Sequence, residues 1–166
     1  YAQVEFDGLK VDVIPWLCKE NEKQLFEKMK TSDSQFCFGH FDIDGFEMYR
    51  GNVCLGGIPK EKFQKYDTVL TGHFHHRSTN GNITYVGTPC EMMWSDYNDV
   101  KGFHILDTET REMEFVANPY QMFYRIKYDD SQTDFDFWKN YDYPKTKDSY
   151  VKIVVLNKQN PYLFDS

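Results

Sequence analysis

The sequence predicts a strand-rich α/β (α+β) fold, and three observations carry this prediction. Short runs of β-branched and aromatic residues, separated by turn residues, occupy most of the chain. One longer segment, residues 19–30, has the spacing of an amphipathic helix. Aromatic residues (14 Phe, 12 Tyr and 3 Trp in 166 residues) are spread over the whole length, which is typical of a packed globular chain.

The first predicted elements are a hairpin and a helix. A turn signal, Asp7-Gly8, lies between two alternating runs, which predicts a hairpin whose second arm ends at Pro15. Leucine, phenylalanine and methionine recur at helical spacing among charged residues in "KENEKQLFEKMK", which predicts a surface helix over residues 19–30.

The middle of the chain is expected to alternate strands with short connections. An apolar strand over residues 34–41 precedes a glycine-rich loop and a short helix over residues 59–66, opened by Pro59. Residues 67–76 are expected to form a strand that runs into a loop at Gly72. Further strands are predicted over residues 82–89 and 122–129, and residues 101–119 are typical of two strands joined by a tight polar turn.

The composition changes near the end of the chain. Residues 129–149 are rich in Asp, Ser, Lys and Tyr, which predicts a linker with a short segment around residues 135–138. The β-branched run "YVKIVVLNK" (residues 150–158) predicts one more strand. Because a single strand cannot bury itself, it either completes the main sheet or begins a second domain.

The charge pattern and the cysteines exclude some classes of protein. The net charge of −7 comes from scattered acidic residues, so DNA binding would require metal ions, a basic patch or a partner. The four cysteines form no close pair of the kind that structural zinc sites use. No stretch approaches the ~20 apolar residues of a membrane helix, and the start is unlike a signal peptide. We therefore expect an intracellular protein without membrane contact.

Three of the five histidines, His73, His75 and His76, follow Gly72 in "VLTGHFHHRS". In a strand, side chains two apart stand about 6–7 Å from each other on one face. Such imidazoles can share one metal ion or bind one each of a close pair. A second predicted strand also ends in Gly-His, at His40, which indicates a cluster of imidazoles at one edge of the sheet.

The residues present exclude several kinds of site. A cupin-type site would need a glutamate where Thr79 and Asn80 stand. A zinc finger would need close cysteine pairs, and a serine-hydrolase site would need a Gly-x-Ser-x-Gly element, which the sequence lacks. A hydrolytic metal centre with oxygen ligands supplied from elsewhere remains.

Together, "FGHFD", "VLTGHFHH", "ITYVGTP" and "KGFHILD" resemble the C-terminal half of calcineurin-like metallophosphoesterases, above all the phage and bacterial SbcD-like nuclease subunits of double-strand-break repair. The order of segments matches through about Tyr128. The resemblance implies part of a metallophosphoesterase β-sandwich with flanking helices over residues 1–128. It further implies a linker over residues 129–149 and the beginning of a small capping domain over residues 150–166.

The same resemblance implies a site with two divalent ions, most often Mn²⁺, that activate water against a phosphodiester. His40 and His73 match the ligands of one ion, and His75 matches a ligand of the other. His76, Asp42 and Arg77 are further candidates for contact with the ligands or the substrate. For His76 an exposed loop, and for Asp42 a simple turn, are the alternatives.

The sequence departs from the family pattern in its carboxylates. The Asp-x-His, Gly-Asp-x-x-Asp and Gly-Asn-His motifs, which supply the bridging aspartate and the catalytic histidine, do not occur. We therefore expect a fragment whose catalytic residues lie upstream, with weak manganese binding and no nuclease activity of its own.

For the parent protein, the resemblance implies a DNA exo/endonuclease of recombination and repair that works with an SbcC-like ATPase, as a homodimer, in the cytoplasm or in the host cytoplasm if phage-encoded. Two alternatives stay open: a phosphatase of the same superfamily, and a non-catalytic interaction module. The strand at residues 150–158 favours the nuclease over a compact phosphatase. The presence of all three histidines favours a metal site over a module.

Overall fold

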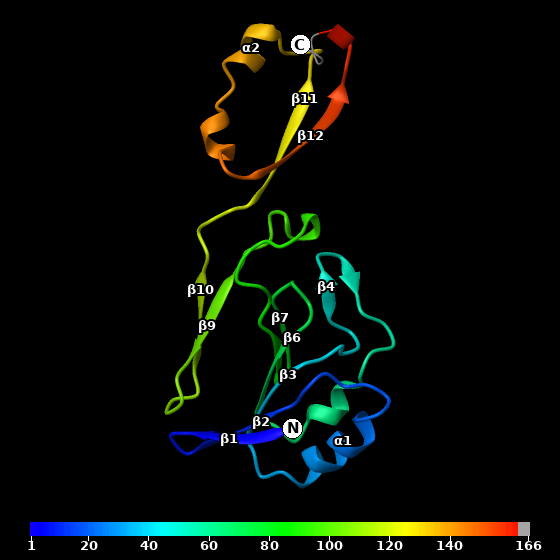
Figure 1. Cartoon of the computed structure of the whole chain (residues 1–166), viewed down its shortest axis with the longest axis vertical. Coiled ribbons are helices and arrows are strands. Elements are labelled where there is room, and N and C mark those ends of the chain that lie inside the picture. The colour runs from blue at the N-terminus through cyan, green and yellow to red at the C-terminus, as the bar shows by residue number, and fades with distance from the viewer. Residues whose placement is uncertain (163–166) are drawn as a thin grey trace. The chain divides into compact units, whose positions relative to one another are not determined.

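The computed structural model describes residues 1–162, except for the side chains of residues 144 and 145. The chain forms two compact units, Tyr1–Pro119 and a second that begins at Tyr120 (Figure 1). Each unit has its own paired strands, so the two are described in turn.

The first unit is built on a six-stranded mixed sheet. Its strands, in spatial order, are β1 (Ala2–Phe6), β2 (Leu9–Val13), β3 (Phe36–His40), β6 (Thr68–Gly72), β8 (Ile83–Tyr85) and β7 (Ser78–Asn80). The four inner strands, β2, β3, β6 and β8, are parallel, whereas both edge strands pair antiparallel. The carboxyl ends of the inner strands therefore meet at one edge of the sheet.

The predicted hairpin is confirmed. Strands β1 and β2 pair from Ala2 opposite Val13 to Phe6 opposite Leu9, around a two-residue turn. Asp7 and Gly8 have φ values of 48° and 83°, the left-handed conformation that such a tight turn requires at both positions.

One face of the sheet packs against helix α1 (Glu22–Thr31) and the short turn η1 (Lys60–Phe63). Leu25 and Met29 of α1 are buried in the core, as the helical spacing predicted. The helix expected over residues 59–66 is a single 3₁₀ turn. The Asn82 amide donates to the carbonyl oxygens of Phe63 (3.1 Å) and Tyr66 (2.7 Å), which ties down the backbone where a longer helix would continue.

A buried carboxylate joins the hairpin to the segment after α1. Asp12 on β2 is fully buried and accepts hydrogen bonds from the hydroxyls of Tyr1 (3.0 Å), Ser32 (2.8 Å), Ser34 (2.7 Å) and Tyr66 (2.6 Å). Burial by itself would raise the pKa of Asp12, but these hydrogen bonds outweigh it and the pKa lies below its ordinary value. Asp12 is therefore ionised at neutral pH in spite of its burial.

Three small elements lie outside the main sheet. The predicted glycine-rich loop contains a short hairpin, β4 (Glu47–Tyr49) and β5 (Asn52–Val53). The turn η2 (Trp94–Asp96) follows β8. The two strands predicted over residues 101–119 are confirmed as an antiparallel ribbon, β9 (Gly102–Leu106) and β10 (Met113–Ala117).

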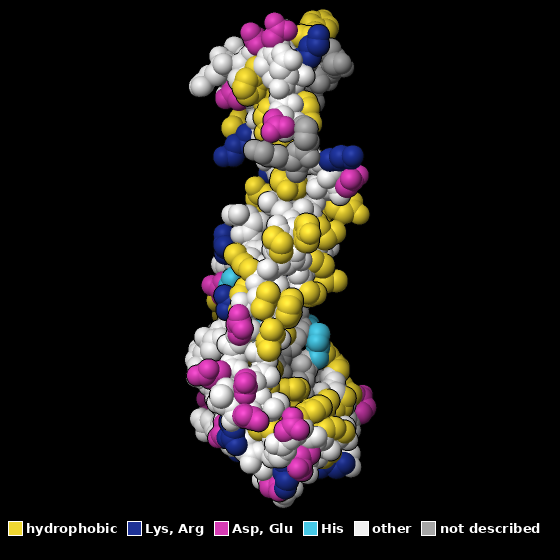
Figure 2. All heavy atoms as spheres, turned by 90° about the vertical axis from the view of Figure 1, so that its left-hand side faces the viewer, with side chains coloured by type: hydrophobic (Ala, Val, Ile, Leu, Met, Phe, Trp, Pro, Cys, Tyr) yellow, Lys and Arg dark blue, Asp and Glu magenta, His cyan; other side chains and the backbone are white. Residues whose placement is uncertain are grey.

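The β9–β10 ribbon exposes an apolar face. Phe103 and Ile105 alternate along β9, so they lie on the same side, and they are 54% and 51% exposed. Figure 2 shows hydrophobic side chains gathered over this part of the first unit.

The second unit is a strand–helix–strand arrangement. Strand β11 (Phe123–Asp129) pairs in parallel with β12 (Tyr150–Asn157), and α2 (Phe135–Lys139) and η3 (Tyr143–Thr146) lie between them in sequence. Trp138 of α2 stacks on Tyr128 of β11, with ring centroids 5.0 Å apart. The connection is thus folded onto the strand that precedes it.

This arrangement differs from the predicted domain boundaries. The sequence placed β11 with residues 1–128 and treated residues 129–149 as a linker. In the structure β11 pairs with β12 in the second unit, and the connection contains helical turns. A parallel pair needs a long crossover, which composition alone does not distinguish from a linker. Residues 163–166 of the predicted capping segment lie outside the described residues.

The fold class is confirmed as strand-rich α+β with a mixed sheet. A partial metallophosphoesterase sandwich is compatible with this arrangement and stays an expectation. Among residues 1–162, no helix is both long enough and apolar enough to span a membrane.

Candidate metal centre

The carboxyl edge of the parallel strands brings together two of the predicted ligands. His40 is the last residue of β3 and pairs with Gly72, the last residue of β6, so that His73 follows directly beside it. The ring centroids of His40 and His73 are 5.3 Å apart. The Trp16 ring, from the segment after β2, lies 5.6 Å from that of His40 and 5.0 Å from that of His73.

The glycines that precede these histidines are required by close packing. A Cβ atom on Gly72 would lie 2.8 Å from Nδ1 of His40, and one on Gly39 would lie 2.1 Å from the Phe41 ring. Each glycine therefore leaves room for a ring that the site or the core beneath it uses.

His73 itself has an unusual backbone. Its φ is +85°, a left-handed conformation that is strained for a residue with a side chain and is often found at functional sites. Strand β6 ends at Gly72, where the strand was predicted to run into a loop, so His73 and His75 lie in that loop. The expected side-by-side strand spacing therefore does not apply to them.

The electrostatic surroundings keep His73 neutral. Desolvation lowers the pKa of His73, the nearby Asp42 opposes this shift, and His40 and His75 add to it. A neutral imidazole has a lone pair, which is the form that binds a metal ion.

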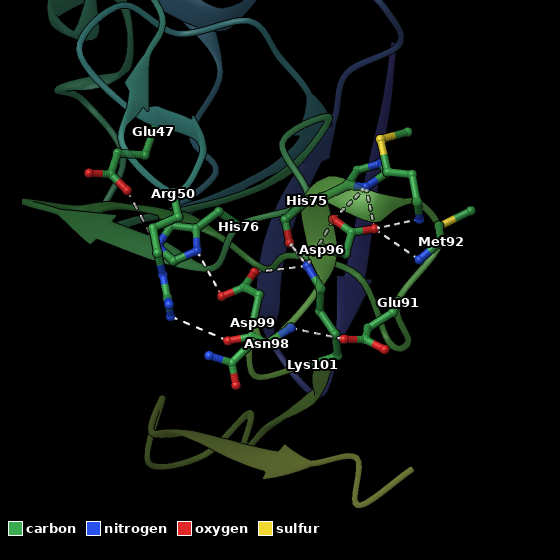
Figure 3. A network of polar contacts seen from close by, with 11 residues as sticks. Glu47, Arg50, His75, His76, Glu91, Met92, Asp96, Asn98, Asp99 and Lys101 are labelled. Carbon is green, nitrogen blue, oxygen red and sulfur yellow. Dashed lines mark hydrogen bonds and ion pairs between the residues drawn. The ribbon is translucent and has the colours of Figure 1, made fainter. Parts of the chain in front are cut away.

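His75 is oriented by a buried carboxylate. Its Nδ1 lies 3.1 Å from both oxygens of Asp96 in η2, whose side chain is 1% exposed (Figure 3). Burial by itself would raise the pKa of Asp96, but backbone N–H groups, His75 and Lys101 outweigh it, and the pKa lies below its ordinary value.

A buried lysine connects this carboxylate to a second one. Nζ of Lys101 lies 2.7 Å from the carbonyl oxygen of His75, 2.9 Å from Asp99 and 3.3 Å from Asp96 (Figure 3). The ammonium group thus has three oxygen partners, one for each of its hydrogens. The loop that carries the histidines is therefore fixed to the segment between β8 and β9.

The three additional candidates have other partners. His76 is partly buried rather than exposed, with Nδ1 3.0 Å from Asp99 and Nε2 3.7 Å from Glu47. The guanidinium of Arg77 lies 4.2 Å from the ring centroid of Phe115 on β10.

Asp42 forms its hydrogen bonds mainly with residues of its own loop. Its carboxylate accepts a hydrogen bond from the Cys54 thiol (2.9 Å), and its carbonyl accepts one from the Ile58 amide (2.7 Å). The negative charge of Asp42 raises the pKa of His73 and so partly opposes the effect of desolvation.

A cleft of about 510 Å³ opens beside His40. Trp16, Phe26, Lys23 and Lys62 line it together with Asp42. The cleft combines aromatic surface with two ammonium groups and two carboxylates, those of Glu22 and Asp42, next to His40.

The histidines supply imidazole donors at this edge of the sheet, but not a complete set of metal ligands. Within the part of the chain that the structure describes, no group of three His, Cys, Asp or Glu side chains is arranged to hold an ion. The histidines are the donors present, while the carboxylates nearest to His75 and His76 face Lys101 or the rings themselves. Imidazole suits manganese or iron when carboxylates complete the coordination.

Three residues of this region were missed by the sequence analysis. Trp16 could have been found from the rule that parallel strand ends meet at one edge, once β2 is recognised as parallel to β3. Asp96 and Lys101 follow no motif. Their pairing depends on the course of the loop between β8 and β9, which the sequence pattern does not predict.

Comparison with known proteins identifies relatives of the chain. It is 37% identical over 152 residues to exonuclease subunit 1 of Enterobacteria phage T4, a match that covers 92% of this chain and 42% of that protein. It is 23% identical over 119 residues to the SbcD subunit of the SbcCD nuclease of Staphylococcus epidermidis, covering 68% of this chain and 32% of that protein. No protein-family profile matches the sequence.

The chain spans less than half the length of either relative. Both relatives are named as nuclease subunits, and the more similar one is a phage protein. The predicted resemblance to SbcD-like nuclease subunits is confirmed, since this chain is similar to part of two such subunits. The predicted metallophosphoesterase superfamily stays an expectation.

Proposed function

We propose that this chain is the histidine-bearing part of a DNA exo/endonuclease subunit that hydrolyses phosphodiester bonds with two divalent ions, Mn²⁺ being the expected metal. The names of the two relatives support the nuclease activity. The observation that carries the metal dependence is the His40–His73 pair, with ring centroids 5.3 Å apart at the carboxyl edge of the sheet.

The proposed roles rest on the family resemblance, and the placement of His40 beside His73 supports them. His40 and His73 lie on adjacent strand ends and would hold one ion, and His75 would hold the other. When bound, a pair of divalent ions lowers the pKa of water and polarises the phosphate. The desolvated, neutral His73 and the carboxylate-bound His75 are both in states suited to ligation.

DNA is the proposed substrate. The net charge of −7 disfavours binding of the phosphate backbone by the bulk surface, so local positive charge has to supply the attraction. Lys23 and Lys62 line the cleft beside His40, where Trp16 offers an aromatic ring, but the carboxylates of Glu22 and Asp42 offset their charge. The bound ions would add charge at the same edge.

We further propose that the parent protein acts in recombination and repair, in the cytoplasm, as a homodimer with an SbcC-like ATPase. The name of the staphylococcal relative, which assigns it to a nuclease called SbcCD, supports an assembly of this kind.

Titration with Mn²⁺, followed by NMR, tests the metal site. The paramagnetic ion should broaden the imidazole signals of His40, His73 and His75 at millimolar concentration, because three imidazoles without carboxylate ligands bind weakly. His104, which lies on β9 and stacks on Phe115, provides the matched reference signal.

Two variants complete this test. His73→Ala should weaken the broadening of His40, because His40 loses its partner ligand for the first ion, whereas His104→Ala should leave it unchanged. Equal broadening of His104 and the three candidate ligands, or none at all, would contradict the proposed site.

The reading frame that precedes Tyr1 provides an independent check. The proposed nuclease requires Asp-x-His, Gly-Asp-x-x-Asp and Gly-Asn-His motifs there. An unrelated upstream sequence would instead favour a non-catalytic module.

A further inference from the structure

Two adjacent histidines, His75 and His76, each place Nδ1 beside a carboxylate, yet their surroundings differ. Nδ1 of His75 faces both oxygens of Asp96 at 3.1 Å, and Nδ1 of His76 faces Asp99 at 3.0 Å. Nε2 of His76 also faces a carboxylate, that of Glu47, at 3.7 Å. His76 therefore has a carboxylate beside each ring nitrogen, whereas His75 has one beside Nδ1.

The contact with Asp96 determines where the proton of a neutral His75 lies. An ionised carboxylate can only accept hydrogen bonds, so Nδ1 must be the protonated nitrogen. Nε2 then carries a lone pair and lies on the side of the ring away from Asp96. This is the tautomer that a metal ligand requires.

Asp96 is itself held as an acceptor from several directions. Its Oδ2 accepts the backbone N–H groups of Met92 (2.8 Å) and Met93 (3.0 Å), and its Oδ1 faces Nζ of Lys101 (3.3 Å). All these partners are donors, so they favour the ionised carboxylate. Lys101 also binds the carbonyl oxygen of His75 at 2.7 Å, which fixes the backbone and the ring of the same residue.

We infer that Asp96, held by Lys101 and by the amides of Met92 and Met93, is a positioning residue that presents His75 with Nδ1 protonated and Nε2 free. His76 lies next to it but has carboxylates at both ring nitrogens. The structure thus distinguishes a histidine prepared for ligation from a neighbour that is not. The metal-binding role of His75 rests on the proposed function. The position of the proton on its ring is a property of the chain without metal.

The substitution Asp96→Asn tests this inference because it replaces an acceptor oxygen by a donor NH₂ group with little change in the shape of the side chain. The amide oxygen would remain with the two backbone N–H groups, which leaves the NH₂ group facing both Nδ1 of His75 and Nζ of Lys101. A neutral His75 can then accept at Nδ1, so the share of the tautomer with its proton on Nε2 should rise. The matched control is Asp99→Asn, which makes the same change beside His76.

Long-range ¹H–¹⁵N NMR at about pH 8, above the ordinary histidine pKa of about 6.5, reports the tautomer of each ring. We expect His75 in the unsubstituted chain to be protonated at Nδ1, to shift toward Nε2 protonation in Asp96→Asn, and to keep Nδ1 protonation in Asp99→Asn. We also expect the Mn²⁺ affinity at His75 to fall about 10–100-fold in Asp96→Asn.

An Nε2-protonated His75 in the unsubstituted chain would overturn the inference, and this outcome does not depend on whether the variant folds. A shift of the His75 tautomer in Asp99→Asn but not in Asp96→Asn would overturn it as well. If instead the tautomers behave as expected but Mn²⁺ broadens no histidine, the proposed metal site fails while the positioning by Asp96 stands.

Discussion

Replacement of Lys101 by methionine removes the charge at the centre of the buried network while keeping a long, unbranched side chain. Lys101 and Asp96 have side chains that are 3% and 1% exposed, and that of Asp99 is 12% exposed. The substitution leaves two carboxylates and the carbonyl of His75 without their shared donor. Breaking one side of a buried ion pair costs about 3–5 kcal/mol, a large part of the ~5–15 kcal/mol that stabilises a typical domain.

Urea unfolding followed by the indole NMR signals measures this loss in the unit where it occurs. Trp94 belongs to the first unit and Trp138 to the second, so Trp138 serves as the internal reference. We expect the free energy of unfolding reported by Trp94 to fall by about 3–5 kcal/mol. A loss below about 1 kcal/mol, the range of exposed pairs, would refute the assignment of Lys101 as a buried structural cation.

A second substitution separates charge from packing. In the combination Lys101→Met with Asp99→Asn, one of the two uncompensated carboxylates is neutral, so part of the lost stability should return. If the double variant were as unstable as the single one, the loss would have to come from packing of the side chain rather than from charge.

Three further predictions concern the sheet and the site. Gly72→Ala places a Cβ atom 2.8 Å from Nδ1 of His40, so the ring should move and the broadening of His40 by Mn²⁺ should weaken, while circular dichroism keeps the spectrum of the parent chain. The pKa of Asp12 is depressed in the folded state, so its contribution to stability is present at neutral pH and lost as the pH falls below about 4. Thermal unfolding of Asp12→Asn should therefore show a smaller drop in Tm between neutral and acidic pH than the parent chain, and an equal drop would contradict this role. With Mn²⁺, the 166-residue chain should not cleave linear duplex DNA, because the motifs that would supply the bridging carboxylate of the proposed site do not occur in it. Cleavage above the background without protein would disprove this.

The strands and their order along the chain were largely predictable because local patterns determine them. The Asp7-Gly8 turn, the helical spacing of Leu25 and Met29, and the β-branched run at residues 150–158 each carry a short-range signal. The pairing of β11 with β12 was not predictable, since it depends on a crossover whose composition is that of a linker.

The residues of the candidate site likewise include some that the sequence predicts and some that it does not. His40, His73 and His75 stand in a recognisable spacing, and the parallel register of β3 and β6 brings the first two together. The metal roles of all three stay predictions. Asp96 and Lys101 could not be predicted, because an irregular loop rather than a periodic element determines their contact with His75.

The pairing of His40 with Gly72 has a consequence for how the chain acquires its site. The two residues are far apart in sequence, and parallel pairing of distant segments is slow because the intervening chain must be closed into a loop first. The β1–β2 hairpin and α1 can form early from neighbouring residues, whereas the histidine pair exists only after β3 and β6 have met in register. Histidine proximity should therefore appear late in refolding, and a one-residue slip of β6 would leave an otherwise compact sheet without the pair.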